Sequence, residues 1–255
     1  MAIVAEGVVR YSSEEAAALV ERLRQIAATG FERQVFSHPF MRELMAGTLP
    51  MSKIRGFFRN WYRFALEINT VKSDAYNHFL PFLERHPDCY DLFTEQIADE
   101  LTHPGPGGHV KMLYKAGEAL GLSREELVES FLIPEARALV DCRIRLWREG
   151  PLAEALASSM TEGPIGVWLG MWHEALTKHY GISEEDAIYF SKHYEADTQE
   201  HEGGVMAHGE GNAYLLRKVL EDGYRPERPG WNLEYSTQLS VDLYELFLNG
   251  VYQRY

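Results

Sequence analysis

The stretch from 190 to 204, FSKHYEADTQEHEGG, places three potential metal ligands at regular intervals. His193, Asp197 and His201 recur every fourth residue, so on a helix they form a row about 12 Å long on one face. Imidazole and carboxylate groups in such a row can bind iron or manganese. The polar residues between them also allow a second interpretation, in which the row belongs to a solvated helix face. Matching ligands elsewhere in the chain would favour the metal site.

Other parts of the chain supply ligand types that would match this row. Glu67 and Glu162 each lie among apolar or small residues, in RFALEINTV and SSMTEGPIGVW. Glu100 and His103 are close together in ADELTHP, and His109 follows a Pro-Gly-rich segment. A carboxylate is costly to remove from water unless a cation compensates it, and a pair of metal ions would do so. Helical bundles bind two such ions with carboxylates and Glu-x-x-His pairs that project inward.

Each candidate also has an explanation that needs no metal. Glu67 could pair with Arg63, which precedes it by about one helical turn. Glu162 could accept hydrogen bonds from backbone donors at the Gly163-Pro164 break, and the Glu-His pair of ADELTHP could lie on a solvated face. Taken together, ligand types on several predicted helices favour a metal site over these separate explanations.

The composition of the 255-residue chain limits the classes of function. Its formal net charge of −13 argues against a nucleic-acid-binding protein and against docking on an anionic membrane. No apolar run reaches the length of a membrane span, and the N-terminal region does not resemble a signal peptide. Because the two cysteines lie far apart and outside any CxxC motif, we expect a cytoplasmic protein with reduced thiols. No P-loop, GxSxG or dinucleotide-binding motif is present in the sequence.

Helical periodicity dominates the sequence, and no alternating run predicts a strand. SSEEAAALVERLRQIAAT begins with a Ser/Glu capping pattern, SREELVESFL carries a second one, and Gly30 is expected to end the first helix. We expect helix interruptions at Gly163-Pro164 and at HGEGN, residues 208–212. No linker or internal repeat divides the chain. The prediction is therefore one all-α bundle, a single domain formed by residues 1–255.

These motifs resemble those of the heme-oxygenase-like di-iron oxidases, a branch of the PqqC/TenA-like superfamily with CADD-type and UndA-type members. YFSKHYEADTQEH is similar to the His-x3-Asp-x2/3-His motif of that branch. MTEGPIGVW is similar to a Glu-containing stretch of its alkene-forming members, and ADELTHPGPGGHVKMLYKAGEALGL to the segment that supplies a Glu and then a His. The resemblance covers residues 35–220 approximately, the core of the domain, and implies a heme-oxygenase-like helical bundle.

The resemblance also implies how two iron ions would share the ligands. The ligands of one ion would be Glu100, His109 and His193, and those of the other Glu162, Asp197 and His201. Glu67 would be an additional carboxylate that bridges the ions or binds on activation, and His103 is the reserve for His109. Two features depart from the family pattern. The Asp197–His201 spacing is one residue longer than the commoner form, and a Pro-Gly-rich insertion separates Glu100 from His109.

The function implied by the resemblance is that of an O2-dependent oxidase or oxygenase with two Fe(II)/Fe(III) ions as cofactor and O2 as co-substrate. A peroxo-di-iron(III) intermediate would oxidise a small amino-acid-like or fatty-acid substrate, and the amino-acid-like class is preferred. Manganese in place of iron is left open. An external electron donor and a homodimer are the other partners that the resemblance allows, whereas nucleic acid and membrane partners are not expected.

Three alternatives remain at the level of sequence. A cofactor-independent PqqC-like oxidase keeps histidines in its pocket, but the carboxylates at Glu100, Glu162 and Asp197 would then lack an explanation. A TenA-like hydrolase uses a cysteine in the segment that here reads ALASSMTEGP, which contains none. The third alternative is a non-catalytic helical binding protein whose polar rows are solvated faces.

Overall fold

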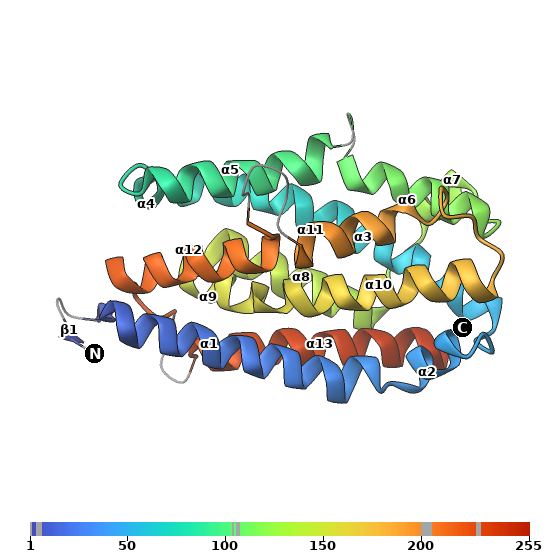
Figure 1. Ribbon diagram of the computed structural model, residues 1–255, viewed down its shortest axis with the longest axis horizontal. Coiled ribbons are helices and arrows are strands. Elements are labelled where there is room, and N and C mark those ends of the chain that lie inside the picture. Colours follow the sequence, from blue (N-terminus) through green and yellow to red (C-terminus); the bar gives the residue numbers. More distant parts are fainter. Residues whose placement is uncertain (1, 4–6, 104, 106–107, 200–205, 228–230) are drawn as a thin grey trace.

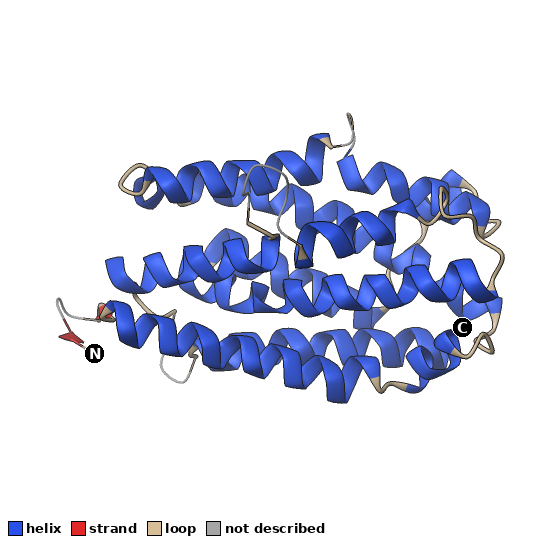
Figure 2. Cartoon of the chain, in the orientation of Figure 1, coloured by secondary structure: helices blue, strands red, loops and turns tan. Residues whose placement is uncertain are grey.

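The computed structural model describes residues 2–3, 7–103, 105, 108–199, 206–227 and 231–255. Long helices run side by side along the longest axis of the molecule, and the two chain ends lie at opposite ends of that axis (Figure 1). Helix accounts for nearly all of the regular structure drawn in Figure 2, with one pair of short strands near the N-terminus of the described chain. The all-α fold class predicted from helical periodicity is confirmed.

The secondary-structure elements follow one another with short connections. Strands β1 (Ala2–Ile3) and β2 (Val9–Arg10) pair antiparallel. The helices are α1 (Ser13–Gly30), which continues as a π-helical segment (Phe31–Phe36), α2 (Pro39–Met45), α3 (Met51–His78), α4 (Leu80–Leu83), α5 (Pro87–Thr102), α6 (Gly108–Ala119), α7 (Arg124–Glu129), α8 (Pro134–Glu149), α9 (Leu152–Ser158), a 3-10 turn (Ser159–Thr161), α10 (Glu162–His179), α11 (Ile188–Thr198), α12 (His208–Asp222) and α13 (Leu233–Arg254). Among the described residues, none of these helices is long and apolar enough to cross a membrane.

Capping residues fix the start of two helices as the sequence predicts. Ser12 and Glu15 form a capping box at the start of α1, and Ser123 and Glu126 form another at α7. The α-helix ends at Gly30 as predicted, although the chain continues in π-helical form to Phe36. Gly30 also serves packing, since a Cβ atom there would lie only 2.7 Å from Val241 Cγ1 on α13.

Aromatic side chains join α3, α10 and α11 in the core. Phe57 stacks on Trp172 with ring centroids 4.1 Å apart, and Trp61 meets Trp168 edge to face at 5.3 Å. The indole Nε1 of Trp61 donates a 2.9 Å hydrogen bond to the hydroxyl of Tyr189 on α11. These contacts bury the aromatic face of α3 and fix α11 against it, which determines where the histidine and carboxylate groups of α11 point.

Two glycines on α10 allow α11 to pack very close to it. A Cβ atom at Gly166 would lie 2.6 Å from Asp197 Cβ and 2.9 Å from Thr198 Cγ2. One turn further along α10, a Cβ atom at Gly170 would lie 2.8 Å from Cδ2 of Tyr194, whose side chain is 40% exposed. The exposed Tyr194 ring can rotate away, whereas the buried Asp197 backbone segment cannot.

We therefore expect Gly166→Ala to destabilise the protein by about 1–3 kcal/mol, because the added methyl group forces α11 away from α10. Gly170→Ala is the matched control and should lower the free energy of unfolding by clearly less. Urea unfolding followed by circular dichroism measures both. Equal costs for the two variants would contradict the close-packing role that we assign to Gly166.

Candidate metal centre

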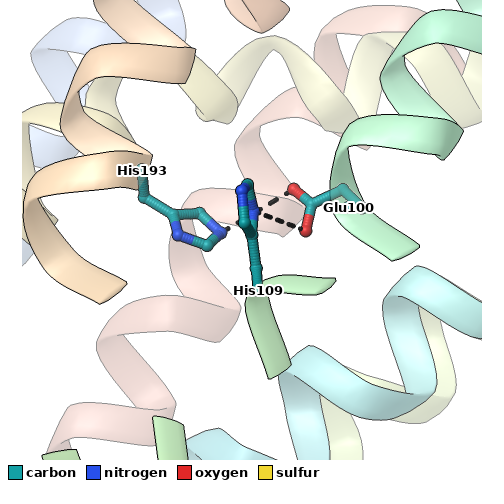
Figure 3. A group of neighbouring side chains, drawn as sticks. All are labelled: Glu100, His109 and His193. Carbon is teal, nitrogen blue, oxygen red and sulfur yellow. Dashed lines mark hydrogen bonds and ion pairs between the residues drawn. The ribbon is translucent and has the colours of Figure 1, made fainter. Parts of the chain in front are cut away.

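Three buried side chains from three helices form the first ligand group: Glu100 on α5, His109 on α6 and His193 on α11 (Figure 3). One donor atom from each lies within 4.8 Å of the others. His109 Nδ1 is 3.1 Å from Glu100 Oε2, and His193 Nε2 is 3.7 Å from Glu100 Oε1. Both imidazoles thus point at the same carboxylate, so the group offers the mixed nitrogen and oxygen donors that iron or manganese can use.

Gly108, directly before His109, lies against the end of α5. Gly108 adopts φ +54°, and a Cβ atom there would lie 1.9 Å from the carbonyl oxygen of Glu100. Only glycine permits so close an approach of the two backbones in this conformation. His109 follows directly, so its imidazole reaches the Glu100 carboxylate.

The second ligand group is Glu162 on α10, Asp197 on α11 and His208 on α12, and all three side chains are buried. Their donor atoms also lie within 4.8 Å of one another, with His208 Nδ1 3.2 Å from Asp197 Oδ1. Glu162 is the first residue of α10, directly after the 3-10 turn that interrupts the chain at this point. The two groups are linked through α11, because His193 and Asp197 lie one turn apart on the same helix.

Polar neighbours hold the second nitrogen of each imidazole. His193 Nδ1 lies 3.0 Å from the carbonyl oxygen of Tyr189, which leaves Nε2 directed at Glu100. Asp99 Oδ2 is 3.3 Å from His208 Nε2 and 3.8 Å from His109 Nε2, so one carboxylate contacts an imidazole of each group. Such outer partners orient imidazole ligands in known metal sites.

A buried lysine and two asparagines complete the polar contacts of the site. Lys72 on α3 is 7% exposed, and its Nζ lies 2.9 Å from Glu162 Oε1. Asn212 donates to the other oxygen of Glu162, and Asn69 donates to Glu100 Oε2 at 2.7 Å. Burial works against the charge of Lys72, but the neighbouring Glu162 outweighs it and raises the lysine pKa. The ammonium group therefore stays charged and is the partner of Glu162 in this structure.

Within the first ligand group, the electrostatics favour an ionised Glu100 and a neutral His193, whereas Glu100 and Asp99 outweigh burial and raise the pKa of His109. Burial opposes ionisation of Glu100, but the adjacent His109 outweighs it and holds the pKa of Glu100 well below its usual value. Burial, together with the charge of His109, lowers the pKa of His193 to about 3. At neutral pH His193 is therefore unprotonated, as a metal ligand must be.

The second ligand group also holds a proton. Burial raises the pKa of Asp197 to about 6. Burial alone would lower the pKa of His208, but its hydrogen bonds to Asp197 and Asp99 raise that pKa to about 10. A proton shared between His208 and two carboxylates thus occupies this part of the site at neutral pH.

The pKa of His208 predicts how the stability of the metal-free protein depends on pH. Because the folded-state pKa of about 10 exceeds the ordinary value of 6.5, the stabilisation is complete below pH 6.5 and is lost as the pH rises towards 10. We expect a loss of about 2–4 kcal/mol in the free energy of unfolding over this interval. His208→Asn should remove most of that dependence, whereas replacing the exposed His78 by Asn should leave it unchanged. Urea unfolding of chelator-treated protein at stepped pH tests this, and parallel curves for wild type and His208→Asn would refute it.

The structure brings together five of the predicted ligands. The five are Glu100, His109, His193, Glu162 and Asp197. Glu67 lies outside both groups, because its carboxylate pairs with Arg137 on α8 at 2.8 Å. His103 has a 67% exposed side chain and pairs with Asp99 at 3.3 Å, so the choice of His109 agrees with the geometry. The predicted ligand His201 falls outside the described residues, and His208 is the imidazole found beside Asp197.

Sequence reasoning missed His208 and Lys72. His208 stands in HGEGN, which was expected to interrupt a helix but forms the first turn of α12. The signal available was a histidine at a helix start, close in sequence to Asp197. Lys72 offered a second signal, because the residues one helical turn away on either side, Ile68 and Ala75, are apolar and so predict an inward-facing position.

A cavity of about 50 Å³ borders both ligand groups, and every residue that lines it is buried. Polar walls come from both groups and from the cations Lys72 and Arg143. The remaining walls are mainly aromatic or aliphatic: Trp61, Phe64, Ala65, Ile68, Ile165, Leu169, Tyr189 and Tyr244. A mostly apolar cavity with a few converging polar groups is typical of a small-molecule site.

Known proteins share both the sequence and the fold of this chain. The pyrroloquinoline-quinone synthase of Ruegeria pomeroyi is 29% identical over 212 residues, which cover 80% of this chain and 79% of the relative. The enzyme of the same name from Gluconobacter oxydans is 31% identical over 177 residues, covering 68% and 70%.

Solved structures match over nearly the whole chain. A CADD-like protein from Nostoc punctiforme aligns with TM-score 0.66 at 16% identity and covers 94% of this chain and 98% of its own. A domain with a heme oxygenase-like fold from Shewanella denitrificans aligns with TM-score 0.63 at 15% identity, covering 92% and 93%. The sequence model of the TENA/THI-4/PQQC family matches residues 23–166, more than half of the chain. The chain therefore belongs to the TENA/THI-4/PQQC family and has a heme-oxygenase-like fold.

Proposed function

We propose that this chain is an O2-dependent non-heme di-iron oxidase that acts on a small amino-acid-like substrate. The synthases among its relatives suggest an oxidoreductase-type enzyme. The observation that carries the finer proposal is the pair of buried three-residue groups that share α11. Each group combines carboxylate and imidazole donors, a set that suits iron or manganese.

The donor atoms fit one ion in each group. Glu100, His109 and His193 would hold the first ion, and Glu162, Asp197 and His208 the second. Bound iron would supply the electrons that reduce O2, and an external electron donor would restore Fe(II) for the next turnover. The outer partner Asp99 contacts His109 and His208 and so keeps both rings in place.

The protein itself excludes water and confines the substrate. The cavity beside the two groups is walled largely by apolar side chains, so a reactive oxygen species formed there would meet the substrate rather than solvent. A cavity of about 50 Å³ has no room for a long acyl chain. Its size disfavours the fatty acids and, among amino-acid-like substrates, favours the smallest.

A second candidate is a cofactor-independent oxidase, and one observation favours it. Each carboxylate of the site already has a cationic partner from the protein, with Lys72 beside Glu162 and His208 beside Asp197. A hydrolase that uses a cysteine nucleophile is not favoured. Burial raises the pKa of Cys89 to about 12 and also raises that of Cys142, so neither is a ready thiolate.

Anaerobic titration of the chelator-treated protein with Fe(II) separates these candidates. We expect uptake of about two Fe(II) per chain, followed by O2 consumption faster than that of the same Fe(II) without protein. Uptake well below one ion per chain would contradict the di-iron proposal. If that metal-free protein nevertheless consumes O2 with a substrate, the cofactor-independent candidate is correct.

A further inference from the structure

Arg143 on α8 is a buried cation without an acidic partner. Its side chain is 2% exposed and lines the cavity beside the ligand groups. Nη1 donates to the Oγ atoms of Ser158 at 2.9 Å and Ser240 at 3.3 Å and to the carbonyl oxygen of Ser158 at 2.5 Å, and Nη2 donates to Ser159 Oγ at 3.2 Å. All of these acceptors are neutral. No carboxylate of the described residues lies within ion-pair distance of Arg143.

The other cations of the site each have a carboxylate within ion-pair distance, which distinguishes Arg143 from them. Lys72 accompanies Glu162, His208 accompanies Asp197, and His109 accompanies Glu100. A buried charge without a counter-charge costs several kcal/mol, and neutral serine oxygens recover only part of that. An anion bound in the cavity would supply the missing counter-charge.

Two hydrogen-bond donors on residues that line the cavity have no acceptor among the described residues. Nε of Arg143 and the hydroxyl of Tyr244 on α13 are both buried and lack a hydrogen-bond partner among the described residues. Both residues line the same cavity. Burial raises the pKa of Tyr244, so its hydroxyl keeps its proton and can donate. A guanidinium and a phenol are a suitable pair for a carboxylate, which accepts through two oxygens.

We propose that the Arg143–Tyr244 end of the cavity binds the carboxylate group of the substrate. Given the proposed oxidase function, the substrate is then a small carboxylic acid whose other end faces the two ligand groups. The cavity of about 50 Å³ has room for roughly four water-sized groups, which matches acetate. Arg143 and Tyr244 thus select the substrate class and orient the molecule.

The test uses acetate as the probe and metal-free full-length protein labelled with 15N in arginine. We expect the Nε–H resonance of Arg143 to shift with saturation as sodium acetate is added, and to stay in place with acetamide or with sodium chloride at equal ionic strength. Arg143→Lys assigns the resonance. Arg148→Gln, an exposed change on the same helix, should leave acetate binding intact.

Tyr244→Phe tests acetate binding independently, because it leaves Arg143 unchanged. We expect it to weaken acetate binding about five- to tenfold, because one hydrogen bond to the anion is lost. Absence of a saturable shift with acetate would overturn the proposal, as would equal shifts with chloride or unchanged binding in Tyr244→Phe. Because the protein is metal-free, failure of iron loading does not affect this result, and a negative result here leaves the di-iron proposal standing.

Discussion

Glu100→Ala is expected to lower the iron content from about two ions per chain to one or fewer and to abolish protein-dependent O2 consumption. Glu100 is the only carboxylate of the first ligand group among the described residues, and both imidazoles of that group face it. Loss of an outer partner alone typically weakens metal binding 10- to 100-fold, so loss of this direct ligand should cost at least about 100-fold. Iron assay after anaerobic loading and desalting, together with an O2 electrode, measures both effects.

Glu67→Ala is the matched control for Glu100→Ala. It also removes a glutamate from a neighbouring helix, but that carboxylate pairs with Arg137 and lies outside both ligand groups. We expect iron content and O2 consumption at the wild-type level, with a small loss of stability of about 1 kcal/mol or less. A Glu100→Ala protein that folds and still retains two ions would show that the first ligand group is not a metal site.

Lys72→Met is expected to strengthen binding of the second metal ion about 10- to 100-fold. The Lys72 ammonium lies 2.9 Å from Glu162 Oε1 and therefore competes with any cation that this carboxylate would bind. Interactions between charges at this distance in a protein amount to a few kcal/mol, enough for an effect of that size. Methionine fills a similar volume and removes the charge.

The same change should destabilise the metal-free protein, by about 3–5 kcal/mol, because Glu162 is left buried without a cation. Metal binding should restore this loss, so the rise in melting temperature on adding Fe(II) or Mn(II) should be larger than in wild type. Lys115→Met, which removes an exposed lysine paired with Glu185, is the control and should change neither quantity. Weaker binding of the second ion in Lys72→Met would show that Lys72 supports the site rather than competes for it.

The fold was largely predictable because helix signals are local. Capping boxes such as Ser12–Glu15 and the 3.6-residue periodicity both act within a few residues of sequence. The packing role of Gly30 was not predictable, because it depends on Val241, which is distant in sequence. A glycine that ends a helix and a glycine that allows another helix to approach look the same in one sequence.

The candidate site was predictable where ligands share a helix and less so elsewhere. His193 and Asp197 must lie together, because one helical turn separates them. Glu67 was included because apolar residues flank it, yet immediate neighbours on a helix point in different directions. Its neighbours one turn away include Arg63 and Thr70, and that pattern already indicates a more polar face. Whether His208 reaches Asp197 depends on where α12 begins relative to α11, and no local sequence pattern reveals that position.

Trp61 and Phe64 belong both to the aromatic core and to the wall of the cavity. Replacing either with a smaller residue to admit a larger molecule would open a void in the core as well, at a cost of about 3–5 kcal/mol. That is a large share of the stability of a typical domain. Evolution towards bulkier substrates on this scaffold would therefore require compensating mutations first, so stabilising changes should precede changes of specificity in the history of such a lineage.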